Sequence, residues 1–443
     1  MFWKVLLRLF VLWWVALRRG VPWLFVPRQR PAYLRKAFED LGPTYIKLGQ
    51  IIASSPGLFP ARYVAEFQQC LDRVPRFPFE TVEHILREEL KVPLDSIYKN
   101  IEATPLAAAS IAQVHGATLH DDSDVVIKVQ RPHIRERVEA DLWFMRKGAW
   151  LGEKFSRDLR LANVVGVIDD FATTIQEELD FTVEGRNMDE FNAIMKRHGE
   201  DHRLVAPYVH WDFTTQRLLT MERFHGIKAD DVDAARALGI DSEEWLRVGL
   251  RGWNLTMMLH GFFHGDVHAG NLMFLPERKQ MGFIDFGIVG RFDQEQRTQV
   301  MRYVLSFATQ DYVELATVMV QMDALEQEVD MDALTADMER VYKPMLEQSL
   351  QSLDYGRLLP DVIANSRKHG IRMPREFILI LKQLLYFDRY AKLAAPDLNV
   401  FTDTYLVDFL FTPAAVECGV NLSQVGALLM AVQQRVQNQT KPQ

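Results

Sequence analysis

The residues most able to do chemistry lie in two short stretches, "HGDVHAGN" at 264–271 and "IDFG" at 284–287. Asn271 follows Asp266 by five residues, and Asp285 follows Asp266 by nineteen. Carboxylate and amide oxygens are the hard ligands that Mg²⁺ prefers, and one or two carboxylates are the usual number. The two spacings together predict a site in which Asp266, Asn271 and Asp285 hold a metal–nucleotide complex.

A lysine lies inside an apolar segment upstream of these stretches. Lys128 belongs to "VVIKVQRP" (125–132), which reads as a short strand ended by proline. An ammonium group among such neighbours needs an anion, because burying an unpaired charge is costly. Nucleotide phosphates and a helix carboxylate would provide it, as for the strand lysine of kinases. The candidate carboxylates are Glu177, Glu178, Asp180 and Glu184. Of these we expect Glu178 to be the partner.

The segment before this strand, "PLAAASIAQVHGA", stands where a kinase has a glycine-rich loop over the phosphates. Its central residues are Ala107, Ala108, Ala109 and Ser110. Alanine cannot adopt positive φ as freely as glycine does. We therefore expect a stiffer loop, whose backbone N–H groups still bind nucleotide phosphates.

The order of predicted elements is α+β. Gly42-Pro43 begins a helix, because proline fits the first helical turn. Strands are predicted around Lys128 and within 216–227 and 264–290, and helical patterns precede, separate and follow them. A small mixed lobe followed by a mainly helical one is the order of a two-lobed, protein-kinase-like fold.

We divide the chain accordingly into four parts. They are a basic, apolar membrane-interface segment (1–30), a helical N-terminal extension (31–100), a kinase-like N-lobe with a helical insert (101–224), and a helical C-lobe with the catalytic and Asp-Phe-Gly loops (225–443).

The bulk composition excludes several classes of function. Two cysteines, Cys70 and Cys418, lie far apart in 443 residues, which argues for a reducing compartment and against a disulfide scaffold or a zinc site. Eight of the 51 Lys and Arg residues, and none of the 59 Asp and Glu residues, lie in 1–38. The remaining chain is therefore strongly acidic, and we expect no nucleic-acid partner.

The first thirty residues are rich in Trp, Phe and Leu with interspersed Lys and Arg. Their longest uncharged run is Leu9 to Leu17, whereas about twenty apolar residues are needed to span a bilayer. This pattern predicts a helix that lies in the interface of an anionic membrane. A helix packed on the protein's own surface is the alternative, and membrane insertion is the less favoured one. Because the C-terminal stretch 422–443 is short and polar at its end, we expect anchoring from the N-terminus or from a partner.

Six motifs occur in the order seen in the UbiB/ADCK (AarF-type) family of atypical protein-kinase-like ATPases, over roughly residues 38–300. They are "KLGQ", "PLAAASIAQVH", "VVIKVQRP", "EELDF", "HGDVHAGN" and "FIDFGIVG". The resemblance implies a kinase-like fold that binds ATP with Mg²⁺. It also implies an ATPase or unorthodox kinase with a role in coenzyme Q (ubiquinone) biosynthesis or related quinone and lipid handling.

The resemblance further implies roles for individual residues. Lys128 resembles the nucleotide lysine, Asp266 the catalytic-loop aspartate, and Asn271 and Asp285 the metal ligands. Lys47 and Gln50 match the family's KxGQ motif, and Glu178 and Asp180 match its Glu-x-Asp element. In the family, the KxGQ helix folds over the active site and contacts that element.

Three functions are compatible with these residues. The leading hypothesis is a membrane-associated ATPase or atypical kinase at the cytoplasmic face of the bacterial inner membrane, or alternatively at the mitochondrial inner membrane. Its expected partners are anionic lipids and quinone precursors or quinone-biosynthesis proteins. The alternatives are a small-molecule phosphotransferase of the aminoglycoside or choline kinase type, and a non-catalytic nucleotide-binding scaffold of a lipid-enzyme complex.

Overall fold

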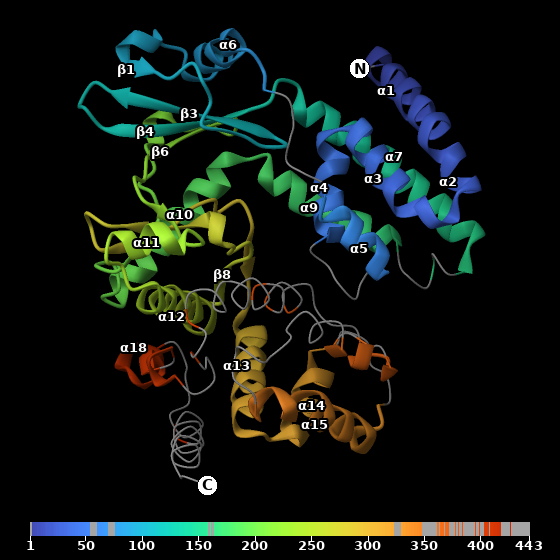
Figure 1. Ribbon diagram of the computed structural model, residues 1–443, viewed down its shortest axis with the longest axis vertical. Helices are drawn as coiled ribbons and strands as arrows, with labels where there is room; N and C mark the ends of the chain where they lie inside the picture. Colours follow the sequence, from blue (N-terminus) through green and yellow to red (C-terminus); the bar gives the residue numbers. More distant parts are fainter. Residues whose placement is uncertain are drawn as a thin grey trace. The chain divides into compact units, whose positions relative to one another are not determined.

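A computed structural model of the chain is shown in Figure 1. It describes residues 2–53, 60–69, 76–157, 160, 164–322, 329–347, 361–362, 364–366, 368–371, 377, 380, 383, 395, 398, 403–406, 408–417 and 426. Two units can be separated: unit 1 comprises residues 1–186 and 208–223, and unit 2 comprises 187–207 and 224–443. The division falls inside helix α10 (Phe181–Arg197), after Arg186. Cys70, Cys418 and nearly all of the C-terminal stretch lie outside the described residues.

Unit 1 is built on an antiparallel sheet with the strand order β1–β3–β4–β6, and β2 pairs with β3. The strands are β1 (Tyr98–Ile101), β2 (Ala107–Ala108), β3 (Ala112–Leu119), β4 (Asp124–Gln130) and β6 (Leu218–Glu222). Val125, Ile127 and Val129 of β4 are buried in one cluster with α6 (Phe79–Leu90). Because side chains alternate along a strand, Lys128 points to the opposite face of the sheet. The strand predicted around Lys128 is confirmed.

Helices make up the rest of unit 1. They are α1 (Phe2–Val15), α2 (Val21–Phe25), α3 (Arg30–Leu41), α4 (Pro43–Ala53), α5 (Ala61–Phe67), α7 (Ile134–Phe155) and α9 (Val164–Glu178), with α10 beginning at Phe181. The predicted helix at Pro43 is α4. Gly42 before it has a φ of 93°, and a Cβ there would lie 2.6 Å from the Arg137 guanidinium. The positive φ therefore favours glycine at the junction of α3 and α4.

Helix α1 packs into unit 1 through a buried charge. Arg8 is 8% exposed and Asp141 of α7 is 0% exposed. The guanidinium donates to both carboxylate oxygens of Asp141, and it donates to Leu41 O at 2.8 Å. Val15 joins Leu41 and Tyr45 in a buried apolar cluster. The alternative of a helix packed on the protein's own surface therefore holds for this face of α1.

The opposite side of the same N-terminal segment is apolar and open to solvent. Its exposed large side chains are Leu9, Phe10, Trp13, Trp14, Leu17, Val21, Leu24 and Phe25. Among the described residues, no helix is both long and apolar enough to cross a bilayer.

Unit 2 contains two small sheets and a series of helices. The sheets have the orders β5–β10–β9–β7 and β11–β8. The strands are β5 (Leu204–Val205), β7 (Ile227–Lys228), β8 (Phe262–His264), β9 (Leu272–Leu275), β10 (Gln280–Phe283) and β11 (Val289–Arg291). Besides the second half of α10, the α-helices among its described residues are α11 (Val232–Ala237), α12 (Ser242–His260), α13 (Gln294–Thr309), α14 (Tyr312–Gln321), α15 (Met331–Glu347) and α18 (Pro413–Glu417). The predicted α+β order, with helices before the mixed lobe, is confirmed.

The buried pair of Arg8 and Asp141 predicts a large effect of one substitution. Asp141→Asn removes the carboxylate charge, so the buried Arg8 guanidinium loses its anionic partner. We expect the free energy of unfolding, measured by urea denaturation, to fall by about 3–5 kcal/mol. Asp40→Asn is the matched control, because Asp40 pairs with Arg19 at a site where its side chain is 24% exposed. It should cost less than about 1 kcal/mol. Equal losses for the two variants would show that the buried pair does not hold α1.

Candidate active site

The loop between β8 and β9 carries Asp266, and Asn271 at its end makes two hydrogen bonds that hold the loop in place. The side-chain nitrogen of Asn271 donates to the backbone oxygen of Asp266 at 2.9 Å, and the backbone oxygen of Asn271 accepts the Ile284 N–H at 2.9 Å. Since Ile284 directly precedes Asp285, Asn271 joins the two stretches that the sequence predicted to act together. Because the Asn271 side-chain nitrogen is bonded to the loop, its side-chain oxygen Oδ1 is the atom suited to bind a metal.

His264 holds the start of this loop. Its ring is fully buried; Nδ1 accepts the Asp266 N–H at 3.1 Å, and Nε2 lies 3.2 Å from Ile284 O. A nitrogen that accepts an N–H carries no proton, so the ring proton is on Nε2 and is donated to Ile284 O. Burial lowers the pKa of His264, which favours this neutral form.

Asp285 is exposed and has a φ of 61°, in the left-handed region that few residues other than glycine adopt. The next residue anchors the turn. Phe286 is fully buried, its ring lies 4.8 Å from that of His264, and its carbonyl accepts a bond from Asn187 Nδ2 at 3.1 Å. A backbone outlier held by buried neighbours is typical of ligand-binding turns.

The donor set in unit 2 suits Mg²⁺. Asp266, Asn271 and Asp285 offer two carboxylates and one amide oxygen, and such a set leaves coordination positions for water and phosphate oxygens. Over the part of the chain that the structure describes, no three His, Cys, Asp or Glu side chains cluster as ligands of a metal.

In unit 1, Lys128 is paired with a carboxylate other than the expected one. Its ammonium lies 2.9 Å from both carboxylate oxygens of Glu184, in the first turn of α10. The two side chains are 13% and 4% exposed. The same ammonium lies 5.3 Å from the centroid of the Phe181 ring. Our expectation that Glu178 is the partner of Lys128 is thus corrected, because Glu184 reaches the Lys128 face of the sheet.

Glu178 instead contacts the KxGQ helix. Its Oε1 lies 2.8 Å from Lys47 Nζ of α4, and the two side chains are 6% and 18% exposed. Gln50 is half-buried one helical turn after Lys47. Asp180, the other residue of the Glu-x-Asp element, accepts bonds from Thr182 N and Oγ1 and so caps the start of α10.

The alanine-rich loop is part of a tight hairpin. Ala107 and Ala108 form β2, and the Ala109 N–H is donated to Ala112 O at 2.9 Å. This corrects the expectation for Ala109, because its amide is used within the hairpin. Ser110 is buried. The Arg131 Nε and Nη2 both donate to Ala109 O, at 3.0 and 2.9 Å, and so fix the tip of the loop.

Two buried glutamines position these parts of unit 1, and the sequence analysis did not select them. The Gln113 side chain accepts the Phe77 N–H at 3.1 Å and donates to Phe77 O at 3.2 Å. Gln130 donates to Leu179 O at 2.8 Å, directly before Asp180, and to Gln216 O at 3.0 Å. The sequence feature that could have identified them is a glutamine within an apolar strand, because a buried glutamine side chain needs polar partners.

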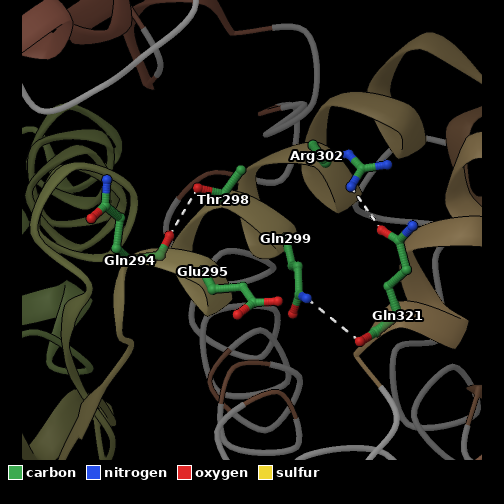
Figure 2. A pocket seen from close by; sticks show the side chains of 6 residues that line it. All are labelled: Gln294, Glu295, Thr298, Gln299, Arg302 and Gln321. Carbon is green, nitrogen blue, oxygen red and sulfur yellow. Dashed lines mark hydrogen bonds between the residues drawn. The ribbon is translucent and has the colours of Figure 1, made fainter. Parts of the chain in front are cut away.

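A separate hollow of about 640 Å³ in unit 2 contains none of the predicted site residues (Figure 2). It is lined by Gln294, Glu295, Thr298, Gln299, Arg302 and Gln321. Arg302 donates to Gln321 Oε1 at 2.8 Å, and the Gln299 amide donates to Gln321 O. Arg302 and Gln299 thus both bind Gln321 within the hollow.

The two lysine pairs in unit 1 predict different effects of two similar substitutions. Glu184→Gln removes the charge beside Lys128, and we expect nucleotide affinity, measured by calorimetry, to fall about tenfold or more. Glu178→Gln alters the contact of Lys47 and should leave Lys128 paired, so nucleotide affinity should change less. Glu177→Gln on the exposed side of α9 is the control. Loss of affinity in Glu178→Gln alone would argue against the pairing seen here.

Comparisons with known proteins identify the family of the chain. Residues 69–319 match the ABC1 atypical kinase-like domain, and residues 338–399 match the UbiB helical domain. The chain is 39% identical over 397 residues to an uncharacterized chloroplastic aarF domain-containing protein kinase of Arabidopsis thaliana, covering 84% of this chain and 73% of that protein. It is 31% identical over 388 residues to a probable protein kinase UbiB of Marinobacter nauticus, covering 86% and 70%.

The fold also matches a solved structure. Rv3197 of Mycobacterium tuberculosis, solved in complex with erythromycin, has a TM-score of 0.50 and 20% identity to this chain, covering 86% of this chain and 97% of its own. At this identity the likeness concerns the fold alone. The domain matches and the relatives confirm the kinase-like fold class, and they show that the chain belongs to the ABC1/UbiB family of atypical kinase-like proteins.

Proposed function

We propose that this protein is an ATPase or atypical kinase that uses Mg–ATP at a membrane surface, in coenzyme Q (ubiquinone) biosynthesis or related quinone and lipid handling. Its kinase-like domain implies ATP binding. The observation that carries the proposal is the bonding of Asn271 to Asp266 and to Ile284, which ties the two metal-ligand stretches together. The resemblance to the UbiB/ADCK family motivates the quinone role.

The proposed division of labour follows from the donor set. When bound, Mg²⁺ would supply positive charge that stabilises phosphoryl transfer. The Asn271 oxygen and the Asp285 carboxylate would hold the ion. The Asp266 carboxylate would orient the attacking hydroxyl or water and accept its proton, while the Lys128 ammonium would bind phosphate.

The N-terminal helices support the membrane part of the proposal. Phe10, Trp13 and Phe25 are 61%, 59% and 79% exposed. The Arg18 guanidinium lies 4.8 Å from the centroid of the Trp14 ring. Exposed aromatic side chains beside cations are typical of helices that lie in the interface of an anionic membrane. We propose the cytoplasmic face of the bacterial inner membrane, or the mitochondrial inner membrane, as the location.

Asp285→Asn tests the nucleotide site, because it removes a charge from the proposed metal ligands. At a Mg–ATP concentration 100-fold above the dissociation constant, wild-type protein gains about 2.7 kcal/mol of stability from the ligand. We expect this gain to disappear in Asp285→Asn, measured as the shift in thermal midpoint on adding Mg–ATP. Asp201→Asn, an exposed aspartate of unit 2, is the control and should keep the shift.

An undiminished shift in Asp285→Asn would refute the metal-ligand assignment. The same proteins, with Asp266→Asn, separate the competing functions in an assay of ATP turnover. Turnover stimulated by cardiolipin-containing vesicles or quinone-precursor analogues, and lost in Asp266→Asn, supports the proposal. Transfer of phosphate to a soluble amine or alcohol would indicate a small-molecule phosphotransferase. Mg–ATP binding without turnover under any of these conditions would indicate a scaffold.

A triple substitution tests the membrane surface. Deletion of the segment would also remove Arg8 and Val15 from the core, so we replace only the exposed side chains, as Phe10→Ser, Trp13→Ser and Phe25→Ser. Full burial of such a side chain is worth about 1.5–3 kcal/mol, so we expect co-sedimentation with anionic vesicles to weaken more than about tenfold. Leu238→Ser with Val313→Ser, at 61% and 64% exposed positions of unit 2, is the control. Equal sedimentation of the triple variant and wild type would exclude this surface.

A further inference from the structure

A glutamine from the segment that matches the UbiB helical domain reaches the catalytic loop. Gln383 is 0% exposed. Its amide oxygen accepts the Val267 N–H at 2.6 Å, and its amide nitrogen donates to Gly265 O. The two backbone groups that it binds belong to the residues on either side of Asp266.

These bonds complete the restraint of the backbone around Asp266. In the Gly265–Asp266 peptide, the N–H is bound by His264 Nδ1 and the carbonyl by Gln383. In the Asp266–Val267 peptide, the carbonyl accepts from Asn271 and the N–H is bound by Gln383. One polar group of each peptide plane thus depends on Gln383. Since the two planes set φ and ψ of Asp266, they also set the direction in which its side chain leaves the backbone.

Only a side chain with a donor and an acceptor on one planar group can make both bonds. Glutamine does so, whereas an ionised glutamate has acceptors only and methionine has neither a donor nor a strong acceptor. A buried peptide group that loses its partner can recover it only by moving. Without the Gln383 amide, the loop should therefore shift or exchange between conformations.

We propose that Gln383 is a positioning residue, which fixes the orientation of the Asp266 carboxylate from the helical domain. The expected effect of Gln383 on turnover rests on the proposed function. The restraint of the backbone around Asp266 does not depend on it. It gives the helical domain a role in phosphoryl transfer, although Gln383 does not contact the nucleotide.

Gln383→Glu and Gln383→Met test the proposal, with the exposed Gln294→Glu on α13 as control. At pH 8 we expect kcat to fall tenfold or more in both Gln383 variants, with the dissociation constant of Mg–ATP changed less than about twofold. A protonated glutamate carries the same donor and acceptor as glutamine, and burial raises its pKa. The kcat of Gln383→Glu relative to wild type should therefore recover as the pH falls towards 5.5, whereas that of Gln383→Met should not.

Hydrogen–deuterium exchange of the 264–271 backbone tests the restraint without turnover. In Gln383→Met we expect faster exchange in this segment and unchanged exchange in α12 and α13. If the wild-type protein shows no turnover, faster exchange of 264–271 in Gln383→Met still supports the restraint. The absence of turnover then counts against the proposed function and not against the role of Gln383. Unchanged exchange in 264–271 overturns the inference. A loss of kcat that follows thermal stability in both variants, without recovery of Gln383→Glu at low pH, also overturns it and assigns Gln383 to packing alone.

Discussion

The candidate active site depends on one constraint, that the peptide groups of a buried loop must find hydrogen-bonding partners. Helices and strands supply such partners from their own backbone, but the loop around Asp266 takes them from side chains. His264, Asn271 and Gln383 each bind a backbone group next to Asp266. The direction in which the Asp266 side chain leaves the backbone is therefore set by side chains from β8, from the loop itself and from a segment more than a hundred residues further along the chain.

In unit 1 the buried groups that need partners are charged. Two largely buried ammonium groups, on Lys128 and Lys47, are paired with Glu184 and Glu178, which lie on consecutive helices. A buried cation needs a carboxylate of its own, because an unpaired one is strongly destabilising. Gln130 holds the turn between the two helices by its bond to Leu179 O. The strand that carries Lys128 and Gln130 thus also sets where both carboxylates lie.

The N-terminal helix shows how one element can serve both the core and a surface. Arg8 is buried against Asp141, and this bond fixes the rotation of α1 about its axis. With that rotation set, Phe10 and Trp13 face solvent. The apolar segment that the sequence predicted as a membrane-interface segment is part of the packing of unit 1, and its open face is the surface that we propose for membrane binding. A substitution that frees Arg8 would therefore disturb both the packing of α1 and the set of side chains that α1 exposes to solvent.

The sequence by itself determined the α+β order, the helix at Pro43, the strand around Lys128 and the family, because these depend on local periodicity, turn residues and motif spacing. It also predicted, from their spacing, that Asp266, Asn271 and Asp285 form one set of ligands, and this stays a prediction. Only the tertiary structure decided which carboxylate pairs with Lys128, since four acidic residues lay within reach along the chain and sequence distance does not say which faces the sheet. It also decided the use of the Ala109 amide within the hairpin and the bonds made by Gln383. Such partners come from distant parts of the chain, and they are selected by burial and hydrogen-bond geometry, which no local pattern records.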